Sequence, residues 1–292
     1  MQDTAIKNQL NFIMLNILTY NILSDPLCNP DYFPKNEKDD LEPGTRQARL
    51  LNEIKPYLEK KYIFTLQEVS VNQWQWLCVC FEHWDYQHHW FSKGVPFDGY
   101  MGIVIAYPRE YRLHDVQYNL LNDFLPNNMS KPSKLYPFLT VYLELPNKTR
   151  FWLTTTHLPA KPSAGDIRRE CLKILSKHLY RCMTDSNCPN LILTGDFNSV
   201  PTILLENANP KFKWKSANTT LEYTLSSWNA RQEHPVQSLV DWVLINSEST
   251  MGIVEGKRIA KPKYIQLLPN KFHSSDHIAV PVSLTIKSKE VK

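Results

Sequence analysis

The chain has 292 residues, of which 42% are hydrophobic, and it carries a formal net charge of +4. This length suits one large domain, and 8 glycines against 20 prolines argue against a flexible, low-complexity chain. The six cysteines contain no C-x-x-C pair, which excludes the usual zinc and disulfide patterns and predicts free thiols in a reducing compartment.

Short apolar runs rich in Val, Ile, Thr, Tyr or Trp predict a strand-rich protein. In chain order they cover residues 12–20, 62–67, 86–91, 102–107, 138–145, 151–156, 191–195, 238–246 and 278–286. The first run lies in an apolar stretch, 10–23, that three asparagines interrupt, so we interpret it as a core strand and not as a signal peptide. The sequence contains no run of 18 apolar residues, so it predicts no membrane span, and we expect a soluble cytoplasmic protein.

Three segments have helical patterns. Residues 45–59 begin at a possible Thr45 cap and contain Pro56, which would end or kink the helix, and residues 71–81 predict a short helix. Residues 163–182 give the clearest amphipathic pattern. The polar stretches 26–43 and 125–137 predict long surface loops. Strands joined by helices, without an obvious linker, predict a single α/β domain over residues 1–292.

Polar side chains stand inside or just after several of the apolar runs. They are Asn21, Glu68, His157, Asp196, Asn198, Asp241, Asp276 and His277. Buried carboxylates need partners, and for acids on separate strands a hard divalent cation is an economical one. Oxygen ligands favour Mg²⁺ or Mn²⁺ over zinc. The two histidines remain for proton transfer and for stabilising a developing negative charge.

Asp196 and Asn198 form the most informative pair, because they follow a buried run and Gly195. Two residues apart on an extended chain place their side chains on the same side. Each polar residue also has a simpler interpretation. His157 alone fits a core histidine, Asp241 a cap at a bend and Asn21 a turn residue, and only their occurrence together favours a catalytic site.

Six motifs, in this order, resemble the endonuclease/exonuclease/phosphatase superfamily over residues 12–286. They are Tyr20-Asn21-Ile22-Leu23, Leu66-Gln67-Glu68-Val69, Thr156-His157-Leu158, Gly195-Asp196-Phe197-Asn198-Ser199, Val240-Asp241-Trp242 and Ser275-Asp276-His277. Further features resemble the branch of nocturnin, the carbon-catabolite-repression-type deadenylases and the 2′,5′-phosphodiesterases. These are the helix led by Arg46, Pro96-Phe97-Asp98-Gly99, Tyr223-Thr224 with Trp228, and Phe272 before the last motif. The resemblance implies a four-layer sandwich of two packed mixed β-sheets flanked by helices.

The resemblance also implies metal-assisted attack of water on a phosphoester. Glu68 would hold Mg²⁺ (or Mn²⁺), with Asn21 beside it and Asp276 reaching the ion directly or through water. For the catalytic residues it implies that Asp196 orients or activates water, Asn198 binds phosphate, His157 stabilises charge, His277 moves a proton or binds phosphate, and Asp241 fixes the His277 tautomer. Asp196 and His277 both remain candidates for the general base.

The substrate is less constrained than the chemistry. The first hypothesis is a 3′-5′ exoribonuclease of deadenylase type, in which Trp228 and Phe272 stack on bases and Lys161 and Arg168 meet phosphates. The alternatives are a small-molecule phosphatase or phosphodiesterase acting on NADP(H) or 2′,5′-oligoadenylate, a DNA phosphodiesterase, and a non-catalytic binding module. His157-Leu158-Pro159-Ala160-Lys161 departs from the His-Leu-Lys-Ala-Arg of nocturnin-like enzymes. A non-catalytic binding module would lack a Glu, Asp or His of the catalytic motifs, and this sequence retains all of them.

Overall fold

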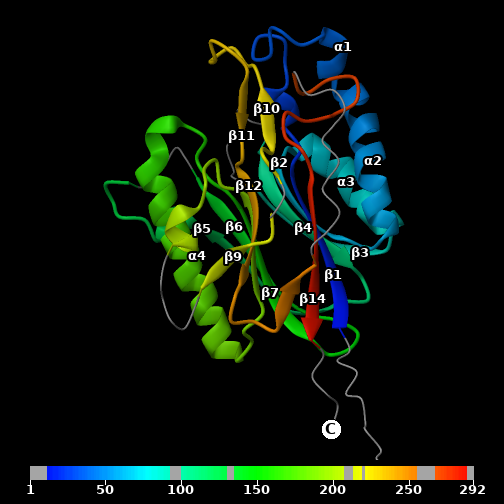
Figure 1. Ribbon diagram of the computed structural model, residues 1–292. Helices are drawn as coiled ribbons and strands as arrows, with labels where there is room; N and C mark the ends of the chain where they lie inside the picture. The colour runs from blue at the N-terminus through cyan, green and yellow to red at the C-terminus, as the bar shows by residue number, and fades with distance from the viewer. Residues whose placement is uncertain are drawn as a thin grey trace, which may run out of the picture.

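The computed structural model describes residues 12–92, 100–129, 135–206, 213–218, 221–254 and 267–287. Two six-stranded sheets form its centre (Figure 1). The first sheet has the strand order β13 (Met251–Ile253), β14 (Val280–Lys287), β1 (Phe12–Asn21), β2 (Ile63–Val69), β4 (Gly102–Pro108) and β3 (Tyr86–Ser92). The second has the order β5 (Arg112–Leu120), β6 (Pro137–Glu144), β7 (Arg150–His157), β8 (Leu191–Asp196), β12 (Asp241–Asn246) and β9 (Trp214–Ser216).

Each sheet is mixed and contains one parallel pair of described strands, β1 with β2 and β7 with β8. A separate two-stranded ribbon joins β10 (Leu225–Ser227) to β11 (Val236–Ser238). The helices are α1 (Lys38–Leu41), α2 (Pro43–Glu59), α3 (Val71–His83), α4 (Gly165–Ser186) and α5 (Thr202–Leu205), with single 3₁₀ turns at Asp25–Leu27, Leu121–Asp123 and Pro162–Ala164.

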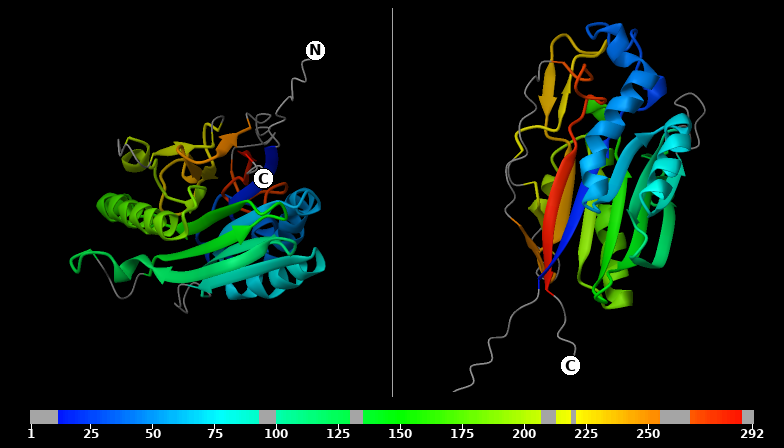
Figure 2. Two further views of the ribbon diagram at one scale, coloured as in Figure 1. Left: turned by 90° about the horizontal axis from the view of Figure 1, so that it is seen from below. Right: turned by 90° about the vertical axis from the view of Figure 1, so that its right-hand side faces the viewer.

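The molecule is a four-layer sandwich, as the family resemblance implied (Figure 2). The two sheets pack face to face over an apolar core that includes Ile17 of β1 and Leu153 of β7. Helix α4 covers the outer face of the second sheet, and α2 and α3 cover the outer face of the first. Central strands that are buried on both faces need continuous apolar sequences, which explains why their runs stood out.

The interior between the sheets also contains a polar bridge. Gln67 of β2 is fully buried, and its Nε2 donates to the hydroxyl of Thr155 on β7 at 3.1 Å and to that of Thr19 on β1 at 3.2 Å. The same nitrogen donates to the Thr65 carbonyl at 3.1 Å. Because buried amides are costly without partners, these bonds fix how the two sheets sit against each other.

The helices follow local sequence rules, and α2 differs from the prediction in two ways. Ser70 caps α3 in a reciprocal capping box with Gln73. Helix α2 begins at Pro43, which fits the first helical turn, and not at a Thr45 cap. The helix also continues past Pro56 to Glu59. Pro56 lies only four residues before Lys60, which ends the helix, so little of the helix depends on the hydrogen bond that proline lacks.

Several strand boundaries also differ from the sequence expectation. The run 238–246 is two elements, because β11 ends at Ser238 and β12 begins at Asp241. Strand β5 was not predicted: it is an edge strand whose side chains are mostly half-exposed, so it lacks a strong apolar pattern. The segment expected as a loop over 26–43 includes α1 and packs its own small apolar cluster around Phe33.

Candidate active site

The candidate site lies at one end of the sandwich, where the carboxyl ends of the two parallel strand pairs meet. Asn21 is the last residue of β1 and Glu68 the penultimate residue of β2. His157 and Asp196 end β7 and β8 and are paired in register. The ribbon β10–β11 and the segment before β14 gather at this same end, opposite the start of β1 (Figure 1). Parallel pairing in each sheet is therefore what brings these four polar residues to one place.

Asp241 and His277 reach the site from antiparallel neighbours. Asp241 begins β12 and lies opposite Asp196 in the ladder between β12 and β8. The Thr224 hydroxyl accepts from the backbone N–H of Asp241 at 2.9 Å and fixes the start of that strand. Ser275 anchors the segment before β14 by donating to the Asn21 carbonyl at 2.7 Å, and its oxygen accepts from the His277 N–H at 3.1 Å.

Irregular backbone aims two of the side chains. Glu68 has φ 58°, and the register between β2 and β4 shifts between Leu66 and Val69. A β-bulge of this kind redirects a side chain, and a non-glycine residue at positive φ is a strained position typical of functional sites. Gly195 has φ 138°, and a Cβ there would lie 2.1 Å from the Thr156 carbonyl oxygen, so only glycine fits before Asp196.

Asn198 lies beyond the end of β8, so strand alternation does not align it with Asp196 as the sequence suggested. Its backbone has φ 50°, and its N–H donates to Asp196 Oδ1 at 2.8 Å in an Asx turn. The Asn198 amide donates to the Leu158 carbonyl at 2.9 Å. The two residues are still neighbours, but a turn brings them together in place of a strand.

Asn21 links two carboxylates of the site. Its fully buried amide nitrogen donates to Glu68 Oε1 at 3.1 Å and to Asp196 Oδ2 at 3.0 Å. Its oxygen accepts from the Leu23 N–H at 3.0 Å, and the Ser24 N–H donates to the second Glu68 oxygen at 3.2 Å. In this geometry Asn21 orients Glu68 through its nitrogen. Sequence patterns did not indicate a role for Ser24, which lies in the turn after β1.

His277 lies between two carboxylates. Its Nδ1 donates to Asp241 Oδ2 at 2.8 Å, and its Nε2 is 3.7 Å from Asp196 Oδ2. Burial lowers the pKa of His277, but the charges of Asp241 and Asp196 outweigh it and hold that pKa well above its usual value. The two carboxylates therefore favour the protonated form of the imidazole, which faces both of them. His157 adds a second ring, with Nε2 3.5 Å from Asp196 Oδ2 and 3.8 Å from Glu68 Oε1.

The acids of the site have raised pKa values because negative charges are crowded and buried. Burial and the neighbouring Asp241 raise the pKa of Asp196 to about 7, although His277 opposes the shift. Burial raises the pKa of Asp276 to about 6, with Glu68 adding to the shift and His277 opposing it. Such shifts are typical of active sites. They also mean that a cation near Glu68 and Asp276 would relieve repulsion.

The donor set fits a hard divalent cation on the Glu68 side. Glu68 and Asp276 supply carboxylate oxygens, the ligands that Mg²⁺ and Mn²⁺ prefer. Asp196, Asp241 and His277 also cluster, with one potential ligand atom from each within 4.8 Å of the others. We do not assign the ion to that trio, because His277 Nδ1 and Asp241 Oδ2 are already bonded to each other at 2.8 Å.

The predicted substrate residues lie in different settings. Lys161 is exposed, whereas Arg168 Nη1 donates to the carbonyls of Pro159 and Lys161, both at 2.8 Å, and so holds the turn after His157. Trp228 is half-buried with the Lys35 ammonium 5.4 Å from its ring centre, and Phe272 is 48% exposed. The predicted step at 96–99 lies outside the described residues.

Arg46 is more central than the sequence suggested. It is 3% exposed, and its Nη1 forms an ion pair with Asp25 at 2.8 Å. Its other nitrogens donate to the carbonyl of Ser274 at 2.8 Å, of Ile22 at 2.9 Å and of Leu23. One guanidinium thus joins the turn after β1 to the segment that carries His277. An arginine that begins an otherwise amphipathic helix face was the only sequence signal.

Two packed mixed sheets with acids, amides and histidines at the ends of their inner strands define a metal-dependent phosphoesterase. The model of the Endonuclease/Exonuclease/phosphatase family matches residues 18–277, and the chain belongs to this family of hydrolases. The match confirms the resemblance drawn from the six motifs. No curated protein sequence is significantly similar to the chain.

Solved structures share this fold over nearly the whole chain. ANGEL2, a 2′,3′-cyclic phosphatase, has a TM-score of 0.79 at 17% identity, covering 95% of this chain and 97% of that one. The human nocturnin catalytic domain with bound sulfate has a TM-score of 0.68 at 20% identity, covering 94% and 97%. Truncated TDP2 from Caenorhabditis elegans has a TM-score of 0.61 at 13% identity, covering 94% and 98%. Nocturnin represents the branch that the motifs indicated.

None of the helices in the described residues is long and apolar enough to cross a membrane. All six cysteines are free, as the absence of a pairing pattern predicted.

Proposed function

We propose that residues 1–292 form one catalytic domain, a Mg²⁺-dependent 3′-5′ exoribonuclease of deadenylase type that hydrolyses RNA phosphodiester bonds. The observation that carries the proposal is the meeting of two groups at one end of the sandwich. The carboxylates of Glu68 and Asp276 are close enough for their charges to interact, and they form the first group. Asp196, which the Asn21 amide joins to Glu68, lies 3.7 Å from the His277 ring nitrogen and forms the second group with it. The first group suits a metal and the second suits the handling of a proton and a phosphate charge.

Glu68 and Asp276 would hold the metal. Asn21 and the Ser24 N–H each bond one Glu68 oxygen, which fixes the carboxylate while its remaining lone pairs stay available. When bound, Mg²⁺ would polarise a phosphoryl oxygen and neutralise charge on the leaving group. Mn²⁺ would serve in the same site because it accepts the same ligands.

Asp196 is the best placed general base. Its pKa of about 7 matches neutral pH, where a base is half ionised and still strong enough to take a proton from water. Asn21 donates to Asp196 and to Glu68 with the same nitrogen, so the base and the metal ligand keep a fixed separation. A water held by Asp196 would therefore face a phosphate bound beside Glu68.

The two histidines would stabilise the phosphate. His277 carries a positive charge, which the Asp241 carboxylate maintains and orients. Its Nε2 and the His157 Nε2 both approach Asp196, so both rings face the place where an attacking water and a phosphate would meet. Donors fixed before the reaction stabilise charge that develops in the transition state. Asn198 would assist by holding Asp196 in its turn.

Surface residues around this end favour a nucleotide chain. Phe272 is exposed close in sequence to Asp276, and Trp228 follows the ribbon strand β10, whose Ser226 N–H donates to the Asp276 carbonyl at 2.9 Å. Aromatic rings at such positions can stack on bases without demanding one sequence. Lys161 supplies a positive charge on the loop after His157.

A second candidate is the hydrolysis of 2′,3′-cyclic phosphates at RNA ends. The similarity to ANGEL2, which was also solved in complex with adenosine-2′,3′-vanadate, favours it. The same base, metal and histidines would serve, because both reactions begin with attack on a phosphorus bonded to ribose oxygens.

The deciding experiment compares substrates with purified protein in Mg²⁺ and in EDTA. The panel contains poly(A), mixed RNA, single-stranded DNA, RNA ending in a 2′,3′-cyclic phosphate, 2′,5′-oligoadenylate and NADPH. We expect stepwise shortening of RNA from its 3′ end in Mg²⁺ alone. Turnover of the cyclic phosphate alone would favour the second candidate, and turnover of NADPH alone would exclude both.

Two variants test the site itself. Glu68→Gln and His277→Asn should each lower kcat by about 100-fold or more, the usual contribution of such groups. Glu59→Gln and His234→Asn change the same residue types at exposed positions and should leave kcat unchanged. Full activity in either of the first two variants would show that the site is wrongly assigned.

A further inference from the structure

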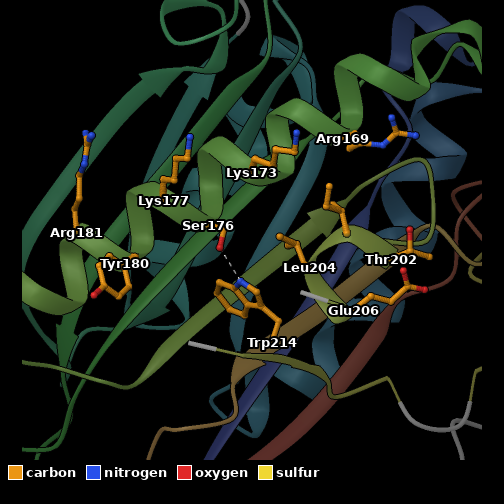
Figure 3. A pocket seen from close by; sticks show the side chains of 11 residues that line it. Arg169, Lys173, Ser176, Lys177, Tyr180, Arg181, Thr202, Leu204, Glu206 and Trp214 are labelled. Atoms are coloured by element: carbon orange, nitrogen blue, oxygen red, sulfur yellow. Dashed lines mark hydrogen bonds between the residues drawn. The ribbon is translucent and has the colours of Figure 1, made fainter. Parts of the chain in front are cut away.

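A groove beside α4 lies outside the candidate active site. It has a volume of about 810 Å³ and lies between α4, α5 and β9 (Figure 3). Its lining residues are Arg169, Lys173, Ser176, Lys177, Tyr180, Arg181, Thr202, Ile203, Leu204, Glu206 and Trp214. None of these residues has a role in the mechanism above.

Four of the lining residues form a basic row. Arg169, Lys173, Lys177 and Arg181 are spaced four residues apart, which places them one above the other on a single helix face. All four side chains are exposed. The row spans three intervals of four residues, or about 18 Å of helix at 1.5 Å per residue. A strand stacked at about 3.4 Å per nucleotide would place about five phosphates along it.

The two halves of the row differ in the ion pairs that the described residues form. Arg169 pairs with Asp166 at 2.9 Å and Lys173 with Glu170 at 3.1 Å, both on the same helix. Among the described residues, no carboxylate lies within ion-pair distance of Lys177 or Arg181. An ordinary solvated helix face alternates its charges, so two unpaired cations on a groove wall point to an anionic ligand.

The opposite wall of the groove combines the apolar side chains of α5 and Trp214 of β9 with one exposed carboxylate, that of Glu206. Trp214 is 5% exposed and donates from its ring nitrogen to the Ser176 hydroxyl at 3.2 Å, which holds the indole against α4. Leu204 of α5 is buried beside Trp214, and Tyr180 of α4 is half-buried near Arg181 (Figure 3). Because Trp214 is buried, Tyr180 is the ring that remains partly exposed, and such a ring beside a row of cations is a combination that single-stranded nucleic acids bind.

The groove is connected to the active site through the beginning of α4. Arg168, next to the first residue of the row, holds the turn that follows His157. Burial lowers the pKa of Arg168, and the nearby negative charge of Asp196 opposes this shift. The row therefore starts close to the proposed catalytic residues and leads away from them along the helix.

We propose that the α4 groove binds the sugar-phosphate backbone of single-stranded RNA upstream of the nucleotide being removed. This inference rests on the proposed exoribonuclease function, because it assumes that a 3′ end occupies the site while the rest of the strand follows α4. The groove then selects long strands over dinucleotides and free nucleotides, and it contributes affinity without taking part in the chemistry.

The test measures binding of fluorescent RNA of two lengths, about 3 and about 15 nucleotides, by anisotropy in EDTA so that no strand is cut. The double variant Lys177→Ala/Arg181→Ala should bind the longer RNA about 20-fold more weakly at about 0.1 M salt, because each lost phosphate contact removes about 0.7 from the salt slope. Binding of the shorter RNA should stay unchanged. The control Lys55→Ala/Lys60→Ala removes one exposed charge from α2 and one from the residue that caps it, and it should bind both RNAs as the wild type does.

Each outcome decides one question. Unchanged affinity of the double variant for the longer RNA, or equal weakening for both lengths, would overturn the groove proposal. Tighter binding of the wild type to an acidic peptide than to the longer RNA would also overturn it. If the protein cuts no RNA but the length-dependent loss is seen, the groove stands and the exoribonuclease proposal fails. Circular dichroism at 222 nm of all variants checks that α4 remains folded.

Discussion

The charge and the orientation of the His277 ring depend on Asp241 more than on any other single residue. The two side chains share a 2.8 Å bond from ring nitrogen to carboxylate, and Asp241 is fully buried. This carboxylate accepts from Nδ1 and so fixes the orientation of the ring, and it stabilises the ring's positive charge. The same charge is what permits Asp196, at 3.7 Å, to remain partly ionised near neutral pH.

The change Asp241→Asn should therefore lower kcat by about 10³- to 10⁴-fold while the protein stays folded, as for a carboxylate that orients a catalytic histidine. The amide keeps the shape of the side chain but offers no charge, so the pKa of His277 falls toward its usual value. Steady-state kinetics and thermal melting measure the two effects. Asp185→Asn, at the exposed end of α4, is the control. A loss of less than about tenfold would contradict the assigned role.

At the scale of the elements, Arg46 of α2 is the connection between the first strand and the last. Its guanidinium bonds carbonyls in the turn that contains Ile22 and in the segment that contains Ser274. The first turn presents the Ser24 N–H to Glu68, and the second segment leads to Asp276 and His277. A planar group with five donors can hold two segments at once, which an ammonium cannot.

Arg46→Lys should consequently weaken Mg²⁺ binding about tenfold, the effect expected when a partner that orients metal ligands is lost. The free energy of unfolding should also fall by about 1–3 kcal/mol, because buried carbonyls lose a donor. The dependence of activity on Mg²⁺ concentration and urea unfolding give the two values. Arg112→Lys, on the exposed edge strand β5, should change neither. Unaltered Mg²⁺ affinity in the first variant would refute the positioning role.

Helix α4 also packs a histidine against the second sheet. His178 lies with its Nε2 3.3 Å from the Thr140 hydroxyl and its ring beside Phe138. Burial lowers the pKa of His178 to about 4, with the Arg181 charge adding to the shift. Because the folded pKa is below the unfolded value near 6.5, His178 stabilises the fold fully above pH 6.5. That contribution is lost as the pH falls toward 4.

His178→Gln should therefore flatten the loss of unfolding free energy between pH 6.5 and pH 4, measured by urea titrations at several pH values. His234→Gln, at an exposed position, should leave the slope as it is in the wild type. If both variants lose unfolding free energy between pH 6.5 and pH 4 as steeply as the wild type, this pH dependence arises from other residues.

Local sequence patterns predict the central strands, but they do not predict the turns and bulges that orient the site residues. Central strands such as β8 are buried on both faces, so their apolar runs and the polar residues that follow them are visible in sequence. The bulge that turns Glu68 at φ 58° depends on pairing with β4, and no local pattern encodes it. The turn at Asn198 and the bond between His277 and Asp241, 36 residues apart, likewise follow from the folded chain.

For the whole molecule, the relative position of the two sheets decides whether the site exists. Asn21 and Glu68 belong to the first sheet, whereas His157 and Asp196 belong to the second. Each half alone offers too few groups for the proposed chemistry. Two fully buried amides described above join the sheets, Asn21 within the site and Gln67, which bonds from β2 to Thr155 on β7. Its neighbour in sequence is Glu68, so a shift at Gln67 moves a proposed metal ligand.

Gln67→Met tests this coupling, because methionine has a similar shape and no amide donors. It leaves the Thr155 and Thr19 hydroxyls without their partner and should lower the free energy of unfolding by about 1–3 kcal/mol. Activity should fall as well, since the two halves of the site lose a fixed separation. Urea unfolding and kcat give both values, with the exposed Gln75→Met as the control. A variant that loses stability but keeps full activity would show that packing of the apolar core alone sets the distance between the sheets.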